Sequence, residues 1–184
     1  MAGTRRVVVG VSGSPASILA LRIGGAQARR DDIPLVAVHA WVPPGGELAA
    51  RRASAPPELR GAWRRAALQR LQDAVESAWG GLPGDLRVEH VLARGPAGPV
   101  LVDIADSADD LLVVGAGPRG ALIRVLRGRV ARYCQARAKC PMLAVPPPAL
   151  AAGRNRLSEW SFRRHELTAD QLLRDLERPG PPGR

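Results

Sequence analysis

The sequence predicts an α/β fold, a doubly wound five-stranded parallel sheet with helices on both faces. Short apolar runs alternate with segments of helical periodicity along residues 5–147, and that alternation is typical of a parallel sheet with right-handed crossovers. Turns rich in glycine and proline separate these segments. The chain has 184 residues and 46% hydrophobic residues, enough for one core without disulfides or a structural metal.

The expected strands are continuous apolar runs, a pattern typical of strands buried on both faces, except for the third, which alternates apolar and polar residues. They are Val7–Val11, Leu35–Trp41, Leu86–Leu92, Leu111–Val114 and Met142–Val145. The expected helices run from Pro15 to about Arg30, from Glu58 to Trp79, from Pro99 to Ser107, and from about Gly128 to Ala138.

Local signals justify these elements in order. Ser14 is a good helix N-cap and Pro15 suits the first helical position, so the first helix begins there. After the second strand, residues 43–46 break the chain and Glu47–Pro57 is expected to be a loop. The second helix has apolar residues three and four apart and stops at the glycines of segment 80–84.

The last 37 residues differ from the rest of the chain. The expected domain boundary lies in a run of three prolines, so that the domain spans residues 5–147 and residues 148–184 form a polar tail. Thr168 can cap a short helix near residues 168–178, and the final residues from Pro179 are expected to be disordered.

Composition excludes a membrane-spanning protein, because no apolar run approaches the ~20 residues that cross a bilayer. The first apolar run is too short for a signal peptide, so we expect a cytoplasmic protein. The two cysteines, Cys134 and Cys140, fit a reducing compartment and lack the spacing of zinc ligands.

Positive charge is concentrated in one segment. The net charge is +10, and 26 of the 27 basic residues are arginine. Residues 111–158 contain nine basic residues and no acidic residue. Such a one-sign segment attracts phosphate, nucleic acid or acidic surfaces, although a solvated face has the same composition.

Two loops rich in small residues follow the first and fourth expected strands, Gly10–Ser14 and Gly115–Gly120. Parallel strands end at one edge of a sheet, where ligands bind, and glycines let backbone N–H groups approach an anion there. The second loop spells GxGxxG, but it follows the wrong strand for a dinucleotide fingerprint. The alternative that the glycines only turn the chain stays open.

Catalytic signatures are missing from the sequence. There is no phosphate-binding GxxxxGK[ST] loop and no G-x-S-x-G nucleophile elbow. His39 and His90 lie in expected strands and His165 in the tail, so no metal cluster is indicated. We therefore expect no enzymatic activity, no catalytic residue and no metal.

Several segments together resemble the universal stress protein (UspA-like) family. They are Val7–Ser14, His39–Trp41, Arg94–Gly95, Asp109–Gly115 and Cys140–Val145, and the resemblance extends over about Arg5–Pro146. It implies an adenine nucleotide alpha hydrolase-like, Rossmann-like fold. It also implies a homodimer, often formed through the last strand, here Met142–Val145. The family includes members that bind ATP and members that bind no nucleotide.

This sequence keeps the spacing of the ATP-binding members but differs from them at Ser12, Ala40, Pro118 and Arg129. Their pattern G-x2-G-x9-G-[ST] has Pro118 at its second glycine and Arg129 at its final hydroxyl, while Gly115 and Gly128 match. The family's aspartate after the first strand is Ser12. Losing one hydrogen bond to a charged acceptor costs ~1.5–3 kcal/mol, so we expect weak binding of ATP or AMP, or none.

The resemblance gives a set of candidate nucleotide-binding positions. They are Gly10, Ser12, Ala40, Gly115, Gly117, Arg119, Gly128, Arg129 and Val130.

Three functions follow, in order of preference. The first is a non-catalytic stress-response module with a degenerate nucleotide pocket. The second is an ATP- or AMP-binding regulatory switch that uses Gly115, Gly117, Gly128 and Arg129. Nucleic-acid binding comes last, because the acid-free segment has one aromatic residue, Tyr133, for stacking. The tail, with Trp160 and Phe162, either docks on the domain or binds a protein partner.

Overall fold

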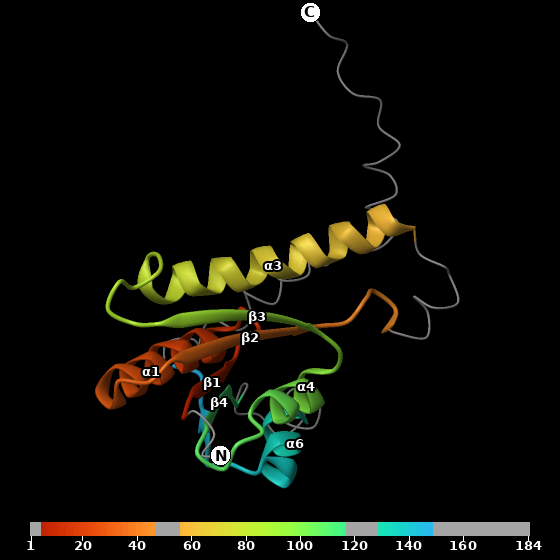
Figure 1. Cartoon of the computed structure of the whole chain (residues 1–184). Helices are drawn as coiled ribbons and strands as arrows, with labels where there is room; N and C mark the ends of the chain where they lie inside the picture. The colour runs from red at the N-terminus through yellow and green to blue at the C-terminus, as the bar shows by residue number, and fades with distance from the viewer. Residues whose placement is uncertain (1–4, 47–55, 117–128, 149–184) are drawn as a thin grey trace, which may run out of the picture.

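The structure is a computed structural model that describes residues 5–46, 56–116 and 129–148. Their order alternates strands and helices (Figure 1). The strands are β1 (Val7–Gly10), β2 (Leu35–Trp41), β3 (Val88–Arg94), β4 (Leu111–Gly115) and β5 (Met142–Val145). The helices are α1 (Pro15–Asp31), α3 (Pro57–Trp79), α4 (Ala97–Ile104) and α6 (Arg129–Arg137).

The five strands form one sheet in the order β3-β2-β1-β4-β5, and every neighbouring pair is parallel. Val8 of β1 pairs with Val36 of β2 on one side and with Leu112 of β4 on the other. The chain winds outward from β1 to β3, then returns to the far side of β1. The doubly wound parallel sheet predicted from the sequence is therefore confirmed.

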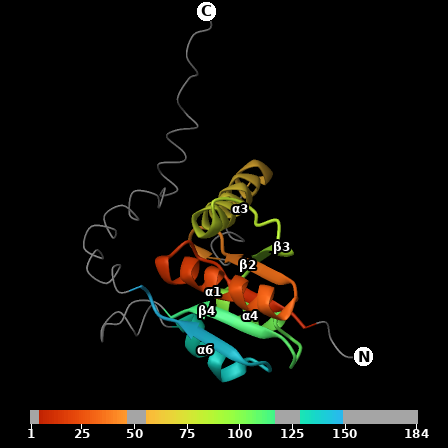
Figure 2. The ribbon, with the colours of Figure 1, turned by 90° about the vertical axis from the view of Figure 1, so that its left-hand side faces the viewer.

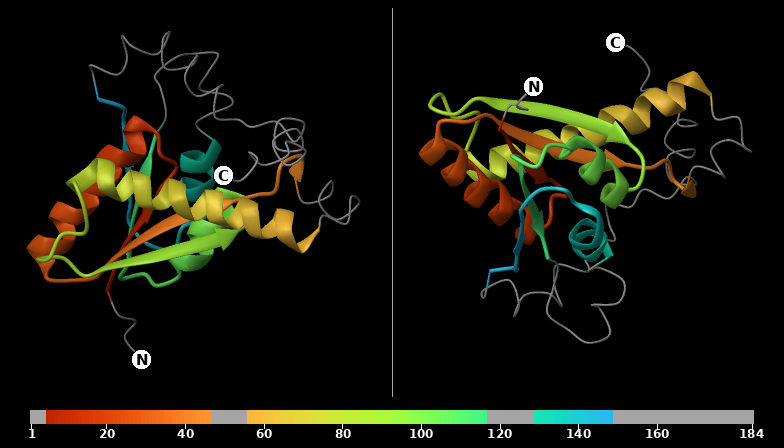
Figure 3. Two further views of the ribbon diagram at one scale, coloured as in Figure 1. Left: turned by 90° about the horizontal axis from the view of Figure 1, so that it is seen from above. Right: turned by 60° about the horizontal axis from the view of Figure 1, so that its bottom comes forward.

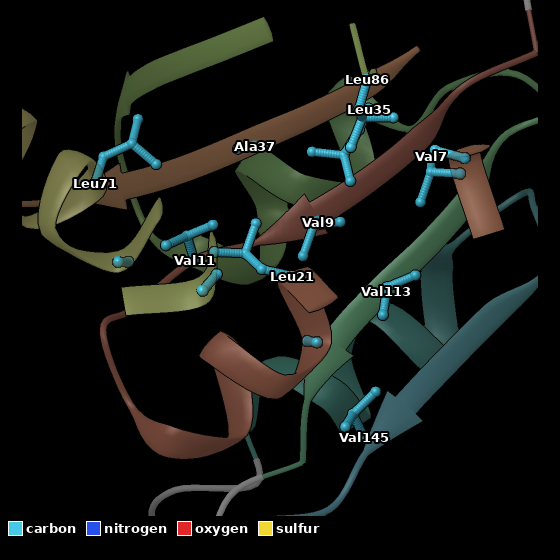
Figure 4. Packing of buried hydrophobic residues seen from close by; sticks show 14 residues of the cluster. Val7, Val9, Val11, Leu21, Leu35, Ala37, Leu71, Leu86, Val113 and Val145 are labelled. Carbon is cyan, nitrogen blue, oxygen red and sulfur yellow. The ribbon is translucent and has the colours of Figure 1, made fainter. Parts of the chain in front are cut away.

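Helices cover both faces of the sheet in a three-layer arrangement (Figures 1 and 2). α1 and α3 pack on one face, where Val7, Val9 and Leu21 are fully buried (Figure 4). α4 and α6 pack on the other face against Val8 and Leu112. Successive β1 side chains point to opposite faces, so the continuous apolar run supplies both halves of the core.

The start of α1 matches its sequence signals. Ser14 is the N-cap, its hydroxyl accepts a hydrogen bond from the Ser17 amide, and Pro15 is the first helical residue. Gly24 and Gly25 lie in the middle of the helix, and a Cβ at Gly24 would meet the Val9 side chain at 2.7 Å. Gly24 therefore brings α1 close to the sheet, while Gly25 makes room for Trp79 at the end of α3.

The other boundaries are near those expected, with two corrections. β3 covers Val88–Arg94 and lies two residues later than expected. It pairs with β2 along its whole length, from Leu35 opposite Val88 to Trp41 opposite Arg94. α4 covers Ala97–Ile104 and begins two residues early. Its Pro99 occupies the third helical position. Proline is tolerated there because the backbone N–H groups of the first turn have no hydrogen-bond partner within the helix.

α3 begins at Pro57, one residue earlier than expected, and ends at Gly80, whose left-handed φ of 73° closes the helix. The rest of the expected loop, residues 47–55, lies outside the described residues, as do Gly128 and the expected tail helix 168–178. Among the described helices, none is long and apolar enough to cross a membrane.

Candidate functional site

The carboxyl ends of β1 and β4 lie side by side where the winding of the sheet reverses (Figure 3). Open parallel sheets bind ligands in the crevice at such a reversal, because neighbouring loops diverge there. Ser12 and Ala116 follow the two strand ends. α1 also begins at this edge, so the site predicted from the two loops is assembled from β1, β4 and the first turn of α1.

Polar groups of the β1–α1 loop bond to one another. The Ser12 amide donates to Ser17 Oγ (3.2 Å), and the Ser12 hydroxyl donates to Ser14 Oγ (3.0 Å). The Ser17 hydroxyl donates in turn to the Ser14 carbonyl (2.9 Å). The Val11 amide is taken by the Val38 carbonyl at 2.8 Å. These N–H and O–H donors of the loop are thus already hydrogen-bonded within the protein, and a phosphate that used them would have to displace these bonds.

Two of the candidate glycines are explained by packing. A Cβ at Gly115 would lie 3.0 Å from the Ala16 carbonyl carbon and from the Ser17 nitrogen. A Cβ at Gly10 would lie 2.8 Å from a methyl group of Leu101. Neither residue has a positive φ in the structure. The close packing of α1 and α4 against the strand ends therefore accounts for both glycines, whether or not a ligand is present.

His39 is a buried structural group at the same edge. Its side chain is 7% exposed, and its Nδ1 lies 2.8 Å from the Val11 carbonyl, so Nδ1 carries the proton and donates. Burial is the main cause that lowers the His39 pKa, and the nearby Arg70 of α3 adds to the effect. A neutral imidazole fixed in this way ties β2 to the end of β1.

Of the remaining candidates, the structure describes Ala40, Arg129 and Val130. Ala40 is half-buried near the end of β2 and pairs with Ala93. Arg129 is exposed and is the first residue of α6, while Val130 packs against the core cluster below α4 and α6. Gly117, Arg119 and Gly128 lie outside the described residues.

The same edge holds residues that the sequence analysis did not single out as a site. Arg94, at the end of β3, lies over the Trp41 ring, with its guanidinium carbon 5.9 Å from the ring centroid. Register pairs the two residues across β2 and β3. In the sequence these two residues appear only within segments that resemble the family. The sequence does not show which residues of separate strands lie opposite one another.

A metal centre finds no support in the described part of the chain, where no group of three or more His, Cys, Asp or Glu side chains gathers. The edge offers hydroxyls, backbone groups, arginines and indole rings. This set suits the recognition of anions and flat rings.

The model of the universal stress protein family matches residues 3–146. Two curated relatives from Mycobacterium tuberculosis, universal stress proteins Rv2005c and Rv1996, are each 33% identical to this chain over 142 and 149 residues, which are 76% and 77% of it. The aligned parts are 47% and 44% of those relatives, so the chain spans about half the length of the curated relatives that it matches.

Solved structures agree in fold. The universal stress protein UspA from Lactobacillus plantarum superposes with a TM-score of 0.57 at 20% sequence identity, and the match covers 79% of this chain and 99% of that one. At this identity the likeness concerns the fold alone, which is the α/β arrangement described above.

Proposed function

This chain belongs to the universal stress protein family, and from that premise we propose that it is a non-catalytic stress-response module with a degenerate nucleotide pocket at the β1–β4 edge. The observation that carries the proposal is the closed serine network of the β1–α1 loop. Ser12 stands where the ATP-binding pattern has an aspartate, and its hydroxyl already donates to Ser14.

The packing of the glycines supports the same proposal. Gly10 and Gly115 satisfy the family pattern, yet Leu101 and the first turn of α1 account for both. Glycines retained for packing are compatible with a pocket that has lost its ligand contacts. His39 Nδ1 donates to the Val11 carbonyl, so the ring holds β2 against the end of β1.

Isothermal titration calorimetry of the full chain with Mg-ATP and with AMP tests the proposal. We expect no saturable heat for the natural sequence at micromolar ligand. We expect Ser12→Asp to restore an acceptor and strengthen binding about ten- to a hundredfold, the equivalent of one charged hydrogen bond. Ser14→Asp is the matched control, because it adds the same charge two residues away and keeps a good N-cap.

Micromolar ATP binding by the natural sequence, abolished by Gly128→Trp, would contradict the proposal and support the second candidate function. That candidate is an ATP- or AMP-binding switch. Arg129 favours it, because its exposed guanidinium can offer a phosphate several charged donors. In this reading Arg129 replaces the missing hydroxyl with a charged donor.

We also propose that the module acts as a homodimer in the cytoplasm. β5 is the edge strand next to β4, and its Leu143 is 40% exposed, so an apolar edge is available for pairing with a second copy. The two cysteines are free and buried, which fits a reducing compartment. A protein partner for the tail, residues 148–184, remains part of the proposal.

A further inference from the structure

Charge is separated along the strand direction. Acidic residues gather near the amino ends of the strands, among them Asp31, Asp85 and Asp110, and arginines pair with them. The carboxyl edge differs. Its described charges are basic apart from Glu58, and they are Arg60, Arg64, Arg65, Arg70, Arg94, Arg129 and Arg132. The net positive charge of the described fold is therefore concentrated at one edge.

α3 supplies most of that charge because it extends beyond the sheet. Its buried residues all lie between Ala67 and Ala78, and nothing from Pro57 to Ala66 is buried. Arg70 is close enough to His39, at the carboxyl end of β2, to affect its pKa. The 13 residues before Arg70 add about 20 Å of helix at 1.5 Å per residue. Figures 1 and 3 show α3 running on past the tip of β3.

In the projecting part of α3, the arginines lie on the same side of the helix that is buried against the sheet between Ala67 and Ala78. Arg64 and Arg60 precede Leu71 by seven and eleven residues, a spacing that returns to the same side of a helix. Leu71 is fully buried, whereas both arginines are exposed. The apolar stripe thus becomes a basic stripe where the helix leaves the sheet, and that stripe overlooks the carboxyl edge. Neither arginine takes part in an ion pair with another described residue.

Two indole rings accompany the arginines. Trp63 is half-buried beside the basic stripe of α3. Trp41, also half-buried, ends β2 with Arg94 over its ring. We call this set the carboxyl-edge ledge. It consists of Trp41, Arg60, Trp63, Arg64, Arg70 and Arg94.

We propose that the carboxyl-edge ledge binds single-stranded nucleic acid. Arginine forks match phosphate oxygens in pairs, and the accessible parts of the two half-buried indole rings can stack on unpaired bases of any sequence. An acidic protein surface would use the arginines but has no need of two stacking rings. The chemistry therefore favours a strand that presents both phosphates and open bases.

In the sequence, the acid-free segment 111–158 contains a single aromatic residue, so nucleic-acid binding is the least favoured function on that basis. The ledge draws its rings and most of its charge from other segments, α3 and the ends of β2 and β3. Only the fold brings these segments to one edge.

Fluorescence anisotropy of the full chain with a labelled oligothymidylate of about 20 nucleotides tests the charges of the ledge. We expect saturable binding that weakens steeply with salt. Arg60→Ala with Arg64→Ala should weaken it about tenfold or more and reduce the salt slope by about 1.4, the value for two lost phosphate contacts on a single strand. Arg30→Ala with Arg87→Ala is the matched control, since it removes two exposed arginines from the opposite edge.

Stacking has its own readout. The oligonucleotide should quench tryptophan fluorescence, and Trp63→Leu or Trp41→Leu should each weaken binding about tenfold while circular dichroism remains that of the folded chain. Three results would overturn the proposal. One is no binding by the folded natural sequence, another is an equal loss in the control pair, and the third is equal affinity for polyglutamate, inorganic polyphosphate or a duplex. None of these results bears on mononucleotide binding, which the calorimetry measures separately.

Discussion

The guanidinium of Arg6 forms an ion pair with the fully buried carboxylate of Asp110 at the amino ends of the neighbouring strands β1 and β4. Its Nη2 lies 2.7 Å from Oδ2 and its Nε lies 3.2 Å from Oδ1, and Nη2 also donates to the Ile104 carbonyl at 3.0 Å. The side chain of Asp110 is 0% exposed. This pair ties the residue before β1 to the loop that ends α4 and leads into β4, so it fixes the two central strands at their amino ends.

Removing Arg6 should destabilise the fold strongly. Arg6→Met leaves the Asp110 carboxylate buried without its partner, which costs about 3–5 kcal/mol in the free energy of unfolding. Urea denaturation measures it, and the double variant Arg6→Met, Asp110→Leu should lose much less than the sum of the singles. Arg5→Met is the control. Arg5 is 63% exposed at 3.5 Å from Asp31, so a loss above about 1 kcal/mol there would contradict this account.

His39 should make stability depend on pH. Its folded pKa lies below the ordinary value of 6.5, chiefly because it is buried. As pH falls through about 6.5, His39 becomes protonated in the unfolded chain while it stays neutral in the folded chain. The free energy of unfolding therefore decreases. Between about pH 7.5 and 5.5, the natural sequence should lose more stability than His39→Asn, whose amide can replace the Nδ1 donor. Equal losses in both would rule out His39 as the source.

Gly115 should tolerate no side chain, even without a ligand. Gly115→Ala forces a Cβ against the backbone of Ala16 and Ser17, and we expect a loss of about 1–3 kcal/mol in thermal or urea unfolding. Gly61→Ala is the matched control in the projecting part of α3. There a Cβ meets only the flexible end of Arg65, and a gain of about 0.5–1 kcal/mol is expected from helix propensity. A neutral Gly115→Ala would leave ligand contact as the better reason for the glycine.

Local signals in the sequence were enough to predict the sheet and most boundaries. Apolar runs long enough for one strand, a serine cap before Pro15 and a glycine stop at Gly80 each act within a few residues. β3 lies two residues later than expected because its register depends on β2, which is about 50 residues away in the chain. A strand's pattern predicts its existence better than its pairing.

The sequence predicts where the candidate site lies, but it does not show why its residues are there. Topology brings the ends of β1 and β4 together, as the alternation of elements implies. The sequence does not show that Leu101 fills the space at Gly10, or that Ser17 takes the Ser12 amide. It also hides the ledge, since Trp41 and Arg64 become neighbours of one edge only when α3 crosses β2.

The two thiols should be inert in the folded protein. Cys134 is fully buried, and desolvation raises its pKa to about 11, while Cys140 is 9% exposed and its pKa is also raised by burial. Because the thiolate is the reactive form, Ellman's reagent at neutral pH should titrate neither thiol quickly, and both within seconds in denaturant. Fast reaction of the native protein would contradict this prediction, and Cys134→Ala would identify which thiol reacts.

Dimer formation through β5 should depend on Leu143. This edge strand is bonded to β4 on one side, and Leu143 is exposed at 40% on an otherwise small and apolar stretch. Pairing two copies of β5 across a twofold axis places each Leu143 near its counterpart, so Leu143→Lys brings two charges together at the interface. Sedimentation velocity should give twice the 19.5 kDa chain mass for the natural sequence and a monomer for Leu143→Lys. Leu82→Lys, at a 66% exposed loop position, should stay dimeric. A monomeric natural sequence, or a dimeric Leu143→Lys, would move the interface away from β5.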